Sequence, residues 1–222
     1  MRGAALLLAA TTAACVAPPG PPGAEVALVD ASPRRMVLDA AGRRVVLAPP
    51  EGACLDAEAA QVAPAAAFAV IRGCGGAPDE ALRIVSVGSA PLFGPDDSFA
   101  GLRALETFLR SPAGRAELGL GGAPEAVRVL DMRRADGALY VLVEDSGEGR
   151  LPLASERFWR AFAELNGRVA VVSYAPLTGV EPDPAAMLAG VEEMVFALGE
   201  ANPEVEPPAP RDAPRPTPPS AR

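Results

Sequence analysis

The chain has 222 residues and a formal net charge of -8, and it contains no histidine. An acidic chain lacks the basic surface that attracts nucleic acid, so we expect no nucleic-acid partner. The absence of histidine excludes Ser-His-Asp and Cys-His catalysis and removes the commonest transition-metal ligand. From the sequence we therefore predict no catalytic residue, no metal and no cofactor.

Residues 1–14 have the pattern of a secretory signal peptide. Arg2 precedes the apolar run "ALLLAA", and small residues follow at 12–14. The apolar run is far shorter than the roughly 20 residues that cross a bilayer as a helix. We expect the segment to be removed, which leaves Cys15 as the mature N-terminus.

The residues "TAAC", from Thr12 to Cys15, resemble the lipobox of bacterial lipoproteins. In that family small residues precede a cysteine that receives a diacylglyceryl group. The resemblance implies that Cys15 is lipidated and attaches the protein to a membrane of the bacterial cell envelope, facing the periplasm. The alternative is an ordinary signal peptide that releases a soluble periplasmic protein. Residues 15–33 begin rich in proline and glycine, so we interpret them as a flexible tether.

Two further cysteines, Cys54 and Cys74, form an even pair outside the signal. In an exported protein such a pair predicts a disulfide, which stabilises by about 3 kcal/mol for a loop of this length. The alternative is a pair of free buried thiols. Neither cysteine has the CxxC spacing of zinc or thioredoxin-like sites.

Between the tether and the proline-rich tail of residues 202–222, which we expect to be disordered, residues 34–201 form one predicted domain. Its first part contains a hairpin in "RMVLDAAGRRVVLAPP" and strands in "AAAFAVIRGC" and "ALRIVSVGSA". Helical spacing follows in "DDSFAGLRALETFLRSPAG", where Ser111 and Pro112 end the run or begin a second short helix. The segment "AVRVLDMRRADGALYVLVEDS" is the clearest hairpin.

Residues 157–165 are ambiguous. Asn166-Gly167 is a strong two-residue hairpin turn, yet Phe158, Phe162 and Leu165 also fit a helix that ends at Gly167. We favour a strand, because the following "RVAVVSY" needs a neighbour. The last helix begins at Asp183 and Pro184 and has an apolar face from Met187 to Leu198.

This order predicts an α+β fold: an antiparallel β-sheet meander covered by two main helices. The order of elements and the final unit "RVAVVSYAP…DPAAMLAGVEEMVFALGEANP" resemble the PsbP-like α/β sandwich, which occurs in lipid-anchored and lumenal proteins. The segments "ADGALYVLVED" and "RFWRAFAELNGRVAVVS" are similar to uncharacterised exported proteins of alphaproteobacteria. Neither resemblance implies an established activity.

Two groups of side chains are candidates for a functional role. The carboxylate pairs Asp96-Asp97 and Glu144-Asp145 are assigned to caps and a solvated turn, because neighbours in an extended chain point in opposite directions. The aromatic residues Phe158, Trp159 and Phe162 are a possible interface or pocket, or else fill the core.

The function that these patterns favour is that of a lipid-anchored, non-enzymatic envelope protein that binds or supports another envelope component, such as a protein partner. One alternative is a periplasmic hydrolase that uses carboxylates from distant elements. Another is a carrier of a small molecule or lipid, which needs an apolar pocket beside Trp159.

Overall fold

The structure is a computed structural model that describes residues 25–76, 79–93, 98–119, 123–148, 153–180 and 183–203. The predicted signal peptide, Cys15 and residues 204–222 of the tail lie outside these ranges. The strands are β1 (Val26–Ser32), β2 (Arg35–Ala40), β3 (Arg43–Leu47), β4 (Ala53–Ala63), β5 (Ala66–Gly73), β6 (Ala81–Gly88), β7 (Val127–Ala135), β8 (Ala138–Asp145), β9 (Arg157–Leu165) and β10 (Arg168–Pro176). The helices are α1 (Ser98–Arg110), α2 (Pro112–Leu118) and α3 (Pro184–Ala201), with a 3-10 turn at Cys74–Gly76.

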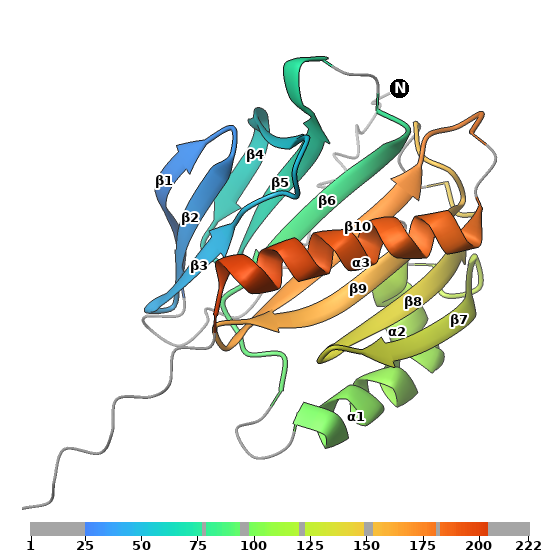
Figure 1. Cartoon of the computed structure of the whole chain (residues 1–222). Helices are drawn as coiled ribbons and strands as arrows, with labels where there is room; N and C mark the ends of the chain where they lie inside the picture. Colours follow the sequence, from blue (N-terminus) through green and yellow to red (C-terminus); the bar gives the residue numbers. More distant parts are fainter. Residues whose placement is uncertain are drawn as a thin grey trace, which may run out of the picture.

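The strands form two antiparallel sheets, which confirms the predicted α+β class. The smaller sheet has the order β1-β2-β3, and the larger has the order β4-β5-β6-β10-β9-β8-β7. The larger sheet departs from a simple meander at one point. After β6 the chain passes through α1 and α2 to the far edge and returns strand by strand until β10 pairs with β6 (Figure 1).

The seven-stranded sheet is covered differently on its two faces. Helix α3 crosses β9 and β10 on one face, and the three-stranded sheet lies beside it (Figure 1). Both contribute to one large apolar core with that face, which includes Leu38, Leu47, Val191 and Leu198. On the opposite face α1 and α2 pack over β7 and β8.

The turn at Asn166-Gly167 decides the ambiguity of residues 157–165 in favour of a strand. Asn166 has φ 50° and Gly167 has φ 73°, the two positive values that a type I′ hairpin turn requires. Strands β9 and β10 pair from Arg168↔Leu165 to Tyr174↔Trp159. The expected hairpins β2-β3 and β7-β8 are also present.

Helix α3 agrees with its sequence pattern. The side chain of Asp183 accepts a hydrogen bond from the Ala185 amide at 3.1 Å, and Pro184 takes the first turn. The buried face consists of Met187, Leu188, Val191, Met194, Val195 and Leu198, as predicted. No helix within the described ranges is long and apolar enough to span a membrane.

Asn202 anchors the end of α3, although the predicted tail begins there. It is 7% exposed, and its side chain accepts from the Val46 amide at 2.8 Å. Its amide group donates to the carbonyls of Val46 and Leu198, each at 2.7 Å. The ordered domain therefore includes Asn202.

Two strands correct the expected boundaries. Strand β1 lies within residues 15–33, the range interpreted as tether, so the ordered part begins by Val26. Strand β4, which carries Cys54, is absent from the strands that the sequence predicted. Backbone hydrogen bonds join these elements, since the Val26 amide donates to the Pro64 carbonyl and the Leu55 amide to the Pro33 carbonyl.

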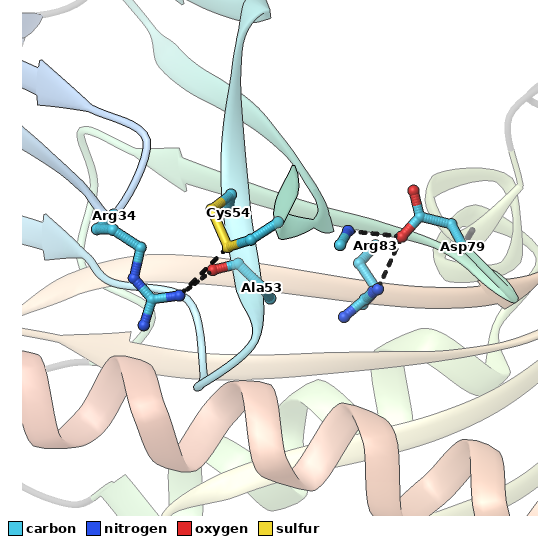
Figure 2. Close-up of a disulfide and its surroundings, with 7 residues drawn as sticks. Arg34, Ala53, Cys54, Asp79 and Arg83 are labelled. Atoms are coloured by element: carbon cyan, nitrogen blue, oxygen red, sulfur yellow. Dashed lines mark hydrogen bonds and ion pairs between the residues drawn. A yellow bond between two sulfur atoms is a disulfide. The ribbon is translucent and has the colours of Figure 1, made fainter. Parts of the chain in front are cut away.

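The predicted disulfide between Cys54 and Cys74 is present, with an Sγ–Sγ distance of 2.02 Å (Figure 2). It joins β4 to the turn that follows β5. Arg34 lies beside it and donates from Nη1 to the Ala53 carbonyl at 2.7 Å. Asp79 accepts from the Gly73 amide and from Arg83 (Figure 2). The bridge is part of a hydrogen-bonded corner of the domain.

Candidate binding cavity

Strand β9 sends its three aromatic residues to different faces of the sheet, because side chains alternate along a strand. Trp159 is 1% exposed and belongs to the core under α3. Its indole Nε1 donates to the Pro184 carbonyl at 3.2 Å. Phe158 and Phe162 pack on the opposite face. The structure thus separates Trp159 from the other two residues.

Phe158 and Phe162 line a cavity of about 350 Å³ on the face that α3 does not cover. The strands β5, β6, β10 and β9 form its floor, and α2 and the end of β8 contribute to its wall. The lining residues are Phe68, Leu82, Ile84, Ser86, Glu117, Asp145, Ala154, Ser155, Phe158, Arg160, Phe162, Val171, Ser173 and Ala175.

The strand register arranges the floor in rows. One row is apolar at both ends, with Phe162 opposite Val171 and Phe68 opposite Ser86. The next row has Arg160 opposite Ser173, which is opposite Ile84. Charge is therefore concentrated on the β9 side of the floor, and the β5 and β6 side is apolar.

Arg160 is the central charged side chain of the cavity. Its Nη1 donates to the carbonyls of Leu118 at 2.9 Å and Glu117 at 3.2 Å, the last residues of α2. Its Nε donates to Ser173 Oγ at 3.2 Å. The guanidinium also lies 5.2 Å from the centre of the Phe158 ring. A cation at the carboxyl end of a helix is favourable because the helix dipole is negative there.

Burial lowers the pKa of Arg160 to about 10, while the nearby carboxylate of Asp145 acts in the opposite direction. The guanidinium consequently remains protonated at neutral pH. Asp145 is itself only 2% exposed, although the sequence assigned it to a solvated turn. It accepts a hydrogen bond from the Gly147 amide at 2.8 Å, within the turn that follows β8.

Glu144 lies outside the cavity lining and is held by two arginines. Arg128 Nη1 approaches its carboxylate at 2.7 Å and Arg157 Nε at 2.8 Å. The hydrogen bond from Arg157, with the charge of Arg128 and Arg157, holds the pKa of Glu144 below its usual value. The Glu144 carboxylate therefore links β8 to β7 and β9. The other predicted pair, Asp96 and Asp97, lies outside the described residues.

A second, larger hollow of about 1260 Å³ lies over the carboxyl-terminal half of α3. Its lining includes Glu192, Glu193, Glu200, Arg43 and Arg44, with the exposed Phe196. Small-molecule sites are concave and mostly apolar with few polar groups. The smaller cavity matches that description better, so we take it as the candidate site.

The sequence singled out Phe158, Trp159 and Phe162, of which Phe158 and Phe162 line the cavity. It missed Arg160 and Ser173, and it assigned Asp145 to a solvated turn. The sequence did contain one signal for Arg160. It lies between Phe158 and Phe162 at every second position of a strand, so the three side chains share one face of the sheet. The partners on β5 and β6 gave no such signal, because their position beside β10 depends on the strand order.

Within the described ranges, no group of three or more histidine, cysteine or acidic residues is arranged to hold a metal ion. No family model matches this sequence, and neither the curated proteins nor the solved structures provide a significant match. The functional argument therefore depends on the cavity and on the sequence patterns.

Proposed function

We propose that this protein is a lipid-anchored module of the bacterial cell envelope that binds a small, largely apolar molecule without transforming it. The observation that carries the binding role is the cavity on the face opposite α3. Its volume of about 350 Å³ falls in the range of roughly 300 to 1,000 Å³ that is common for small-molecule sites. Its lining joins an apolar floor to a few polar groups on one side.

The carrier alternative required an apolar pocket beside Trp159, and this requirement is not met, because Trp159 is buried in the core under α3. The proposed cavity lies on the opposite face of the sheet, beside Phe158 and Phe162. The buried indole belongs to the core, so Trp159 supports the floor from behind.

The envelope location is supported by two features of different kinds. The "TAAC" segment resembles a lipobox and would attach Cys15 to lipid. The Cys54–Cys74 disulfide fits an oxidising compartment such as the periplasm, because cytosolic thiols are kept reduced. An ordered domain that begins near Val26 leaves a short segment between the lipid and the first strand.

The binding role is tested by titration with N-phenyl-1-naphthylamine, an uncharged dye whose fluorescence rises in apolar sites. A Val171→Phe variant fills the cavity, and we expect it to weaken dye binding about tenfold or more. Val180→Phe is the matched control, since Val180 is 42% exposed and lies outside the cavity lining. Thermal unfolding of both variants checks that they are folded, and we expect a cooperative transition in each. Equal dye affinity in the two variants contradicts the proposed binding role.

The anchor is tested separately by the intact mass of the protein from its native envelope. A chain that begins at Cys15 and carries acyl groups supports the anchor, provided that Cys15→Ser removes both the acyl mass and membrane association. An unmodified chain that begins at Cys15 contradicts it and favours a soluble periplasmic protein.

A further inference from the structure

The charged side of the cavity restricts the ligands that it can hold, an inference that rests on the proposed function. Arg160, Glu117 and Asp145 line this side, whereas Phe68 and Leu82 line the other. A buried arginine in an apolar cavity often indicates a receptor for an anionic headgroup. The contacts of this arginine indicate a different role.

Arg160 is bound to the protein itself. Two carbonyls at the end of α2 and the hydroxyl of Ser173 accept its hydrogen bonds. The Asp145 carboxylate stabilises its positive charge further. The guanidinium thus fixes α2 to the sheet, and its charge is compensated before any ligand enters.

The charges around the cavity also oppose an anion. Two acidic residues, the buried Asp145 and the exposed Glu117, line the cavity with one guanidinium. A carboxylate ligand would lose its hydration and approach the negative charges of Glu117 and Asp145. It would gain no unpaired cation in return, because Arg160 is already bound to protein groups. Burial of a charge without such compensation is costly.

Serine hydroxyls offer the cavity an uncharged means of recognition. Ser173 Oγ accepts from Arg160 Nε, and Ser155 Oγ accepts from the Arg157 amide at 3.2 Å. In both hydrogen bonds the serine oxygen is the acceptor, so its O–H remains the group that it can donate. A hydroxyl or ester oxygen of a ligand is a suitable acceptor for these donors.

We infer that the cavity binds uncharged amphiphiles, an apolar chain that carries a hydroxyl or ester group, in preference to carboxylates of the same length. The apolar chain lies over the β5 and β6 side of the floor, and the polar group faces Ser155 and Ser173. Arg160 acts as a positioning residue that holds the α2 wall.

The test is competition for bound N-phenyl-1-naphthylamine by octan-1-ol and octanoate at neutral pH. These probes have the same chain length and differ in the charge of the headgroup. We expect octan-1-ol to displace the dye at a concentration at least about tenfold lower than the concentration of octanoate that is needed. Octanoate that competes as well as the alcohol, or better, overturns the inference and leaves the binding role intact. Displacement by neither probe also overturns it, whereas failure of the dye to bind at all contradicts the proposed function.

A Glu117→Gln variant tests the electrostatic cause. Removal of this carboxylate should raise the affinity for octanoate relative to octan-1-ol severalfold, because one like charge is lost. Glu192→Gln on α3 is the matched control, since Glu192 is exposed like Glu117 but lies outside this cavity. An unchanged ratio in the Glu117 variant overturns the assignment of selectivity to the charged wall.

Discussion

Among single residues, Glu144 holds three strands together. It lies on β8, with Arg128 of β7 and Arg157 of β9 as its direct neighbours in the register. Its side chain is 17% exposed and contacts both arginines. Charged pairs that share one carboxylate form a small network, which contributes more reliably than an isolated surface pair.

We predict that Glu144→Gln is less stable by about 0.5 to 1 kcal/mol near neutral pH. The pKa of Glu144 is lower in the folded than in the unfolded chain. Its contribution is therefore present above the unfolded value of 4.5 and is lost as pH falls through the folded value. Urea unfolding near neutral pH and at about pH 3 measures this difference. The exposed Glu148 provides the control variant Glu148→Gln, and a deficit that persists unchanged in acid contradicts the prediction.

The two adjacent carboxylates also show what sequence can predict at this scale. Alternation along a strand predicted that Glu144 and Asp145 do not share a site, and their contacts agree. The prediction that Asp145 lies in a solvated turn was wrong, because the residues that follow α2, such as Gly119, pack close to its carboxylate. Such tertiary contacts leave no local pattern.

At the scale of elements, α3 lies close to the sheet at Gly190. A Cβ at this position would lie 2.5 Å from Cε2 and 2.7 Å from Cζ of the Tyr174 ring on β10. Gly199 lies on the same helix, and a Cβ there would meet no heavy atom within 4 Å. Substitution of Gly190 by alanine therefore tests close packing, whereas the same substitution at Gly199 tests helix propensity alone.

We predict that Gly190→Ala lowers the free energy of unfolding by about 1 to 3 kcal/mol, since the aromatic ring must shift. Gly199→Ala should raise it by up to about 1 kcal/mol, because alanine is the better helix former. Thermal or urea unfolding of the two variants provides the comparison. If both substitutions change stability in the same direction, the packing argument fails.

The elements that sequence predicted and those that it missed differ in their local signals. The β9-β10 hairpin and α3 have a turn dipeptide or a cap beside a periodic apolar face. Strand β4, "ACLDAEAAQVA", is rich in alanine and has few β-branched residues. Its pairing with β5 and the disulfide to Cys74 define it, and neither interaction is visible in the residues of β4 alone.

For the whole molecule, the disulfide joins positions that are 20 residues apart and fastens β4, an edge strand of the larger sheet. We predict that the double variant Cys54→Ser/Cys74→Ser loses about 3 kcal/mol of stability. Urea unfolding measures the loss, and the reduced wild-type chain should behave like the variant. Cys15→Ser is the control with a cysteine outside the disulfide replaced, and it should leave the stability of the domain unchanged. A double variant as stable as the control contradicts the prediction.

The cavity is the property of the whole molecule that sequence could not provide. Its floor joins β5 and β6 to β9 and β10, four strands that come together only because β10 pairs with β6. Sequential pairing, which the sequence favoured, would have placed β6 beside β7. The fold class was therefore predictable from element patterns, whereas the site required the order of strands.

The β6-β10 pair also has a consequence for the order in which the chain folds. The strands β4 to β6 form one set of local hairpins, and β7 to β10 form a second set. During synthesis on the ribosome the amino-terminal strands are made first. The edge of β6 therefore stays unpaired until residues 168–176, which form β10, have been synthesised. Pairing between distant strands is slow, and an open edge favours association with other chains. We therefore expect truncation before β10 to yield an aggregation-prone product rather than a smaller soluble domain.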